Sequence, residues 1–204
     1  SKRFAFDLSS NLRLFGEESR YRHNIDFSPR FRVNDKILLT AYGGRFFWPN
    51  DVGFVNYDGD SIILGKRDNV TFEGLVQANY TPNVKMSFGL RLRHYWSFAE
   101  YSASYNLGDD GSLLPTTYNS FDAEGNSFDD VNFNAFNVDF VYTWFFAPGS
   151  ELNIVWKNSI YQFGTYLPEN YLNDIDQVFD APVGNNFSIK LLYYLDYLYL
   201  KKKQ

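Results

Sequence analysis

Three oxygen-bearing side chains at alternate positions form the nearest approach to a metal-binding loop in this chain. They are Asp122, Glu124 and Asn126, in an acidic stretch. Calcium loops of the EF-hand type also place oxygen ligands at alternate positions, but they need a glycine at the sixth position and a bidentate Glu at the twelfth. Because both are missing here, the segment predicts at most a weak calcium site. The alternative is loop charge exposed to water.

Groups that could perform catalysis are scarce in the sequence. His23 and His94 are the only two histidines, the chain has no cysteine, and each histidine falls on the apolar alternation of its segment. No Ser, His and Asp pattern indicates a nucleophile, and thiolate metal sites are excluded. The sequence therefore identifies no catalytic residue and predicts no cofactor.

Four charged residues are expected to form ion pairs in an enclosed polar interior. If the segments around residues 68–80 and 84–99 pair with Tyr80 opposite Val84, then Glu73 faces Arg91. Across the turn at 147–150, Asp139 and Lys157 lie close together on the same side. Such pairs offset the cost of removing each charge from water.

The composition indicates one domain over residues 1–204, with large rings interleaved among polar residues. Aromatic residues make up 20% of the chain, yet the mean hydropathy is only -0.36. The net charge of -5 argues against nucleic acid as a partner. No apolar run approaches the roughly 18 to 20 residues of a membrane-spanning helix.

Alternating apolar and polar residues predict long two-faced strands. In the stretch from Val84 to Phe98, every second residue is apolar, aromatic or His, and the residues between include two arginines and a lysine. Eight such segments are expected, at about residues 3–14, 20–33, 36–48, 68–80, 84–99, 132–146, 151–161 and 186–199. Short turns alternate with longer connections at 15–19, 49–67, 100–131 and 162–185. This order is typical of an all-β, antiparallel up-and-down barrel.

The apolar side of these strands is expected to face lipid. Spanning roughly 30 Å of hydrocarbon takes about 9 to 11 tilted residues, which these segments reach. Trp96, Trp144 and Tyr80 lie toward strand ends, where amphipathic rings settle at headgroup depth. An eight-stranded interior is too narrow for so many rings. A soluble lipocalin-like barrel with its apolar side inward remains the alternative.

Several stretches resemble one family of outer-membrane proteins. They are SPRFRVNDKI (28–37), ILGKRDNV (63–70), LRLRHYW (90–96), FNAFNVDFVYTWFFAPGSELNIVWKNSI (133–160) and NNFSIKLLYYLDYLYL (185–200). That family carries an N-terminal carbohydrate-binding-like domain, followed by a domain of unknown function predicted to form a barrel. The resemblance implies an exported Gram-negative envelope protein and supplies no catalytic residues. The chain would be either the C-terminal strands of a larger barrel or a shortened relative that closes on eight strands.

The function expected from these patterns is that of a transmembrane barrel in the outer membrane. It would serve as a membrane anchor or as an interaction subunit of an envelope complex, with outer-membrane lipid and other envelope proteins as partners. Part of a wider, porin-like barrel that forms a transport pore is one alternative. An outer-membrane enzyme and a soluble binder of apolar ligands are the others.

Overall fold

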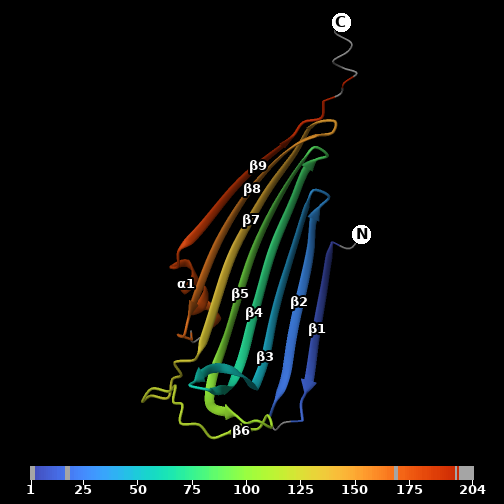
Figure 1. The fold of residues 1–204 in the computed structure, drawn as a ribbon. Helices are drawn as coiled ribbons and strands as arrows, with labels where there is room; N and C mark the ends of the chain where they lie inside the picture. Colours follow the sequence, from blue (N-terminus) through green and yellow to red (C-terminus); the bar gives the residue numbers. More distant parts are fainter. Residues whose placement is uncertain (1–2, 17–18, 168–169, 196, 198–204) are drawn as a thin grey trace.

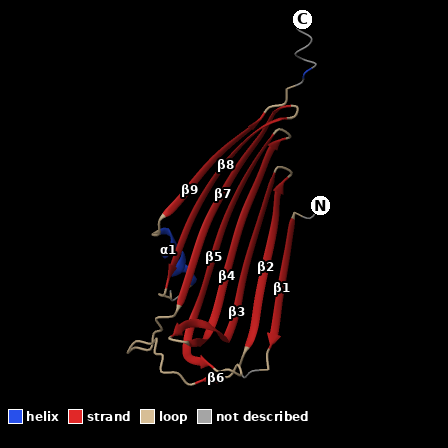
Figure 2. Ribbon diagram, viewed as in Figure 1, coloured by secondary structure: helices blue, strands red, loops and turns tan. Residues whose placement is uncertain are grey.

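The computed structural model describes residues 3–16, 19–167, 170–195 and 197, and these form one antiparallel up-and-down sheet with a short helix against it (Figures 1 and 2). The elements are β1 (Phe4–Leu14), β2 (Tyr21–Asn34), β3 (Ile37–Asp58), β4 (Ser61–Asn83), β5 (Met86–Leu107), β6 (Leu113–Leu114), β7 (Val131–Ala147), β8 (Ser150–Gly164), α1 (Tyr171–Phe179) and β9 (Val183–Leu192).

The strands lie side by side in the order β1-β2-β3-β4-β5-β7-β8-β9, and the two-residue β6 pairs with β5. Every pairing is antiparallel, which confirms the predicted all-β, up-and-down arrangement. Among the described residues β1 and β9 do not pair with each other, so the sheet is open at both edges. Closure into a barrel stays a prediction.

The turns between β2 and β3, between β4 and β5, and between β7 and β8 lie at the upper end of the sheet in Figure 1, and the long connection between β5 and β7 lies at the lower end. The predicted loop at 49–67 is wrong, because β3 and β4 continue through it as a hairpin that turns at Gly59. Gly59 has a φ of 58°, a conformation that glycine adopts without strain. Ile63, in this hairpin, is fully buried.

The C-terminal strand is shorter than expected. The sequence predicts a strand at 186–199, whereas β9 ends at Leu192 and residues 193–195 are not in a strand. Position 196 and positions 198 and 199 lie outside the described residues.

Two turns shift the registers that the sequence predicts. The chain turns at Val84 and Lys85, so that Asn83 pairs with Met86, and a bulge follows before Tyr80 pairs with Phe88. The Asn83 side chain stabilises this turn by accepting a hydrogen bond from the Lys85 amide at 2.8 Å. The predicted register of Tyr80 opposite Val84 is therefore wrong by four residues, an even number that leaves the faces unchanged.

The turn between β2 and β3 has the opposite consequence. Asn34 pairs with Ile37, and an irregularity next to Arg32 makes Phe31 the partner of Leu39. A two-residue turn at residues 34 and 35 would give a different register. The observed pairing is displaced from it by one residue, so the two sides of β3 are exchanged. As a result, Trp48 stacks on Phe15 at 6.0 Å on the polar side of the sheet.

The buried hydrophobic residues lie toward the lower half of the sheet rather than at the end with the short turns. They are Ile63, Val70, Trp96, Ala99, Tyr101, Ala135, Ile160 and, on α1, Val178. Helix α1 packs against β7 and β8. No helix in the described part of the chain is long and apolar enough to cross a membrane.

Candidate functional site

One side of the sheet is a continuous apolar surface, which we call the apolar face. Residues directly paired across the strands point to the same side, and each set of partners forms a register row. The apolar face includes Phe4, Phe6 and Leu8 of β1; Ile25, Phe27 and Phe31 of β2; Ile37 and Leu39 of β3; Val76, Ala78 and Tyr80 of β4; Phe88, Leu90 and Leu92 of β5; Val138, Phe140 and Tyr142 of β7; Ile154 and Trp156 of β8; and Phe187 and Ile189 of β9.

Large side chains on this face are left open to the surroundings. Val76 is 53% exposed, Phe27 46% and Ile189 73%. Rings contact one another along the rows, as where Phe88 lies between Tyr80 and Tyr142, with ring centroids 5.8 and 4.8 Å away. The surface is therefore cohesive but uncovered over most of its area.

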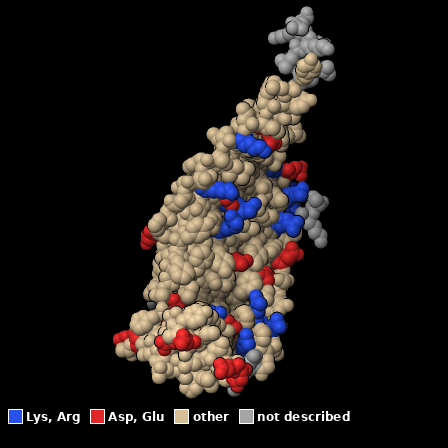
Figure 3. All heavy atoms as spheres, in the orientation of Figure 1, with Lys and Arg blue, Asp and Glu red and all other residues tan. Residues whose placement is uncertain are grey.

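The opposite side, which we call the polar face, carries the charged residues predicted to pair. Asp139 lies in one row directly between Arg91 and Lys157. The carboxylate of Asp139 accepts a hydrogen bond from Arg93 Nη2 at 3.0 Å. Figure 3 shows charged side chains of both signs over this side, with acidic residues prominent on the lower loops.

The predicted pairing of Glu73 with Arg91 is wrong. Glu73 is directly opposite Tyr95, whereas Arg91 is opposite Gln77. The cause is the four-residue shift at the turn of Val84 and Lys85, which moves the whole of β5 along β4 while both residues stay on the polar face.

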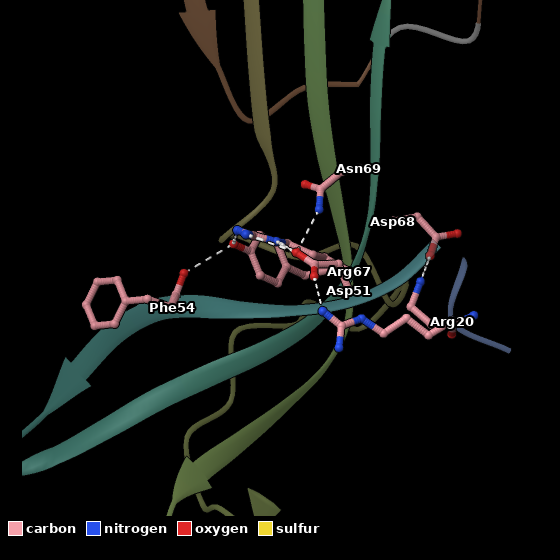
Figure 4. A network of polar contacts seen from close by, with 8 residues as sticks. Arg20, Asp51, Phe54, Arg67, Asp68 and Asn69 are labelled. Carbon is pink, nitrogen blue, oxygen red and sulfur yellow. Dashed lines mark hydrogen bonds and ion pairs between the residues drawn. The ribbon is translucent and has the colours of Figure 1, made fainter. Parts of the chain in front are cut away.

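A buried carboxylate organises the lower end of the polar face (Figure 4). Asp51 has 7% of its side chain exposed, and its two oxygens accept hydrogen bonds from Arg20, Arg67 and Asn69 at 3.1 to 3.4 Å. Arg67 also donates to the hydroxyl of Tyr101 at 2.7 Å. These contacts join the outer part of the β3–β4 hairpin to Arg20, in the connection between β1 and β2, and to Tyr101 on β5.

The residues of the candidate calcium loop are used to close a turn. Asp122 Oδ1 accepts hydrogen bonds from the amides of Glu124 and Asn126 at 3.0 and 2.7 Å, and Oδ2 accepts one from Asn126 Nδ2 at 2.9 Å. The bond from the Asn126 side chain, helped by the amides, holds the pKa of Asp122 below its ordinary value. Across the described residues, no three His, Asp or Glu side chains converge as metal ligands would.

Asp130, a second acidic residue in the connection between β5 and β7, has a pKa that shifts in the opposite direction. Asp130 is 8% exposed and accepts a hydrogen bond from the Tyr101 amide at 2.7 Å. Burial raises the pKa of its carboxyl, and the Tyr101 bond opposes that shift only in part. Asp130 therefore anchors the end of the long connection to β5 and is not available as a loop ligand.

Beneath α1, His94 forms the centre of a buried polar cluster. Its Nδ1 lies 2.8 Å from the Tyr171 hydroxyl, and its Nε2 lies 2.9 Å from Asn134 Oδ1 and 3.5 Å from Asp174 Oδ2. Asn134 Nδ2 in turn donates to the backbone carbonyl of Asp174 at 3.1 Å. Burial, together with the Asp174 charge, raises the pKa of Tyr171, which therefore stays a neutral phenol.

The imidazole bridges the Tyr171 hydroxyl and the Asn134 side chain, and it is itself only 7% exposed. Neither oxygen of the fully buried Asp174 carboxylate has a hydrogen bond, and His94 Nε2 lies 3.5 Å from Oδ2, close enough to offset part of the cost of burying this polar group. The arrangement fixes α1 to the apolar face.

Sequence reasoning placed His94 correctly on the apolar side of its strand but missed the helix that covers it. The signal is present: Tyr171, Ile175, Val178 and Phe179 recur at helical spacing. Asn170 precedes the helix and accepts a hydrogen bond from the Asn173 amide at 3.1 Å, which is the contact of an N-cap.

Comparison with known proteins yields one match. A family model described as "Domain of unknown function (DUF5916)" matches residues 1–204. No curated protein and no solved structure matches the chain.

Proposed function

We propose that this chain, which belongs to the DUF5916 family over residues 1–204, is an integral β-barrel domain of the Gram-negative outer membrane that serves as an anchor or interaction subunit of an envelope complex. The observation that carries the proposal is the apolar face. Eight long neighbouring strands expose large hydrocarbon and aromatic side chains on one side and keep most ionic side chains on the other. In lipid, such a surface needs no further protein cover.

The free energy of solvation supports this placement. Exposed apolar surface costs roughly 25 cal/mol for each Å² in water, and a contiguous apolar patch above a few hundred Å² is uncommon on a soluble monomer. Phe187, Ile189 and Leu191 on β9 are each at least 65% exposed. A soluble lipocalin-like barrel would have to close around this face, whereas a membrane barrel turns it outward.

A transport pore in a wider barrel is the second candidate, and the open sheet favours it. In a bilayer the unpaired backbone groups along β1 and β9 would each cost several kcal/mol. The edges must then pair with each other or with further strands. If further strands complete the ring, the polar face with Arg91, Arg93 and Lys157 lines an aqueous channel.

Among the candidate functions in the membrane, an enzymatic role has the least support. The buried cluster of His94, Tyr171 and Asp174 is the nearest arrangement to an acid–base device. It reaches the surface only through Tyr171, and it is accounted for by the docking of α1.

Two measurements test the proposal. A folded outer-membrane barrel runs faster than its boiled form on a detergent gel and stays with membranes washed in carbonate. A protein that is released by carbonate and is monodisperse in plain buffer would refute the membrane proposal. For the two membrane candidates, planar-bilayer recordings decide: discrete conductance steps support a pore, and silence from inserted protein supports an anchor.

A further inference from the structure

We propose that the apolar face carries a binding site for one phosphate-bearing lipid, with the phosphate on Arg45 and an acyl chain in the groove beside it. The inference rests on the proposed membrane location and goes beyond it by naming a ligand and the residues that hold it.

Arg45 is an ionic side chain in an apolar setting. From the row of Phe47 up to the short turns, it is the only Lys, Arg, Asp or Glu on the apolar face of the described strands. Its guanidinium lies over the rings of Phe47 and Phe72, 5.0 and 5.7 Å from their centroids. The side chain is exposed, so its hydrogen-bond donors are free to meet a ligand.

A groove of about 480 Å³ lies beside this guanidinium. Gly74 forms part of its floor and has no side chain that would fill it, whereas the ring of Phe27 takes up the space over the directly paired Gly43. Phe27 and Tyr171 stand on either side: Phe27 covers Gly43, and the Tyr171 hydroxyl is 3.5 Å from where a Cβ of Gly74 would lie. The groove is therefore open to the surroundings and lined mainly by apolar side chains and glycines, which suits an acyl chain.

The position of Arg45 along the strands corresponds to headgroup depth. Its row continues through Phe72 to Trp96, and the row at the opposite end of the apolar band contains Met86 and Trp144. Met86 and Trp96 are ten residues apart, or ~33 Å along the strand. At the usual tilt of about 40° this spans ~25 Å, the height of the apolar band of outer-membrane barrels.

The chemistry of this site selects a phosphate. A guanidinium binds phosphate oxygens with two parallel hydrogen bonds, and aromatic rings beneath it leave its edge free for them. The nearest acids on the same face of the strands, Asp68 and Glu100, are two register rows farther from the apolar band. Asp174 of α1, which packs on this face, is fully buried beside His94. No carboxylate of the described strands therefore competes for Arg45 within its own row.

The test measures lipid retention by the native polypeptide in a neutral detergent, using native mass spectrometry. The probes are phosphatidylglycerol and a diacylglycerol with the same chains. We expect phosphatidylglycerol to be retained about tenfold more strongly, the effect of one charge-assisted hydrogen-bond pair. Arg45→Gln should abolish that preference, and Gly74→Val, which fills the groove floor, should weaken retention of both probes.

Arg30→Gln is the matched control, because Arg30 is an exposed arginine on the polar face. It should retain lipid as the native protein does. If Arg45→Gln keeps the preference, or Arg30→Gln loses it equally, the site is refuted while the barrel stands. If the protein fails the carbonate and gel tests yet binds phosphatidylglycerol through Arg45, the barrel is refuted and the site stands.

Discussion

His94 Nε2 lies 3.5 Å from the carboxylate of Asp174, and this contact joins the middle of β5 to helix α1 on the apolar face. Both side chains are almost fully buried, at 6% and 1% exposed. A buried carboxylate without hydrogen bonds is tolerated only with a nearby compensating group. The pair therefore determines whether α1 stays docked.

Removal of one member of this pair should undock the helix. His94→Leu leaves Asp174 buried and uncompensated, and we expect a loss of about 3 to 5 kcal/mol in the free energy that protects α1. Hydrogen exchange of the amides in 171–179 measures it. The double variant with Asp174→Leu should recover most of the loss, because an apolar pair carries no charge to compensate. A double variant as unprotected as the single one would contradict this account.

Asp51 should hold the outer β3–β4 hairpin in place. Asp51→Ala removes the shared acceptor of Arg20, Arg67 and Asn69, and we expect a loss of about 1.5 to 3 kcal/mol in local stability. Limited proteolysis at the turn near Gly59 reports the opening. Asp60→Ala, at the exposed turn, is the control and should change stability by less than about 0.5 kcal/mol. Equal cleavage of the two variants would show that the network does not hold the hairpin.

The two faces should respond differently to a new charge. Val76→Arg, at the middle of the apolar face, should cost roughly 2 to 4 kcal/mol in a bilayer folding assay. Asn79→Arg is on the same strand but on the polar face, opposite Gly89, where there is room for the side chain. It should cost less than about 0.5 kcal/mol. Similar costs at both positions would mean that the apolar face does not meet lipid.

The turn closed by Asp122 should open in acid. Because its pKa in the folded protein lies below the ordinary value of 3.8, the carboxylate stabilises the turn above pH 3.8 and loses that effect as the pH falls through the folded pKa. Amide protection of Glu124 and Asn126, corrected for intrinsic exchange, should fall in that range. Asp122→Asn, which cannot ionise, should show protection that no longer changes with acidity. Unchanged acid sensitivity in this variant would assign the effect to another group.

The alternation of apolar and polar residues determined the strand class, the order of the strands and most of their positions. Period-two patterns are local, so Val84 to Phe98 or 132–146 can be recognised without any neighbour. The same alternation placed His94 on the apolar side and Asp139 beside Lys157. These features depend only on whether a residue occupies an odd or an even position along its strand, and on a tight turn nearby.

The registers of the strands, the helix that covers His94 and the unpaired edges of the sheet could be learned only from the tertiary structure. A shift at a turn moves a whole strand. The four-residue shift at Val84 and Lys85 is why Glu73 meets Tyr95 instead of Arg91, and the one-residue shift between β2 and β3 is why Trp48 lies on the polar face. The contacts of Tyr171 and Asp174 with His94 join segments far apart in the chain, and local patterns carry no information on such distances. Whether β1 and β9 meet depends on the curvature summed over all strands, a property that no single segment possesses.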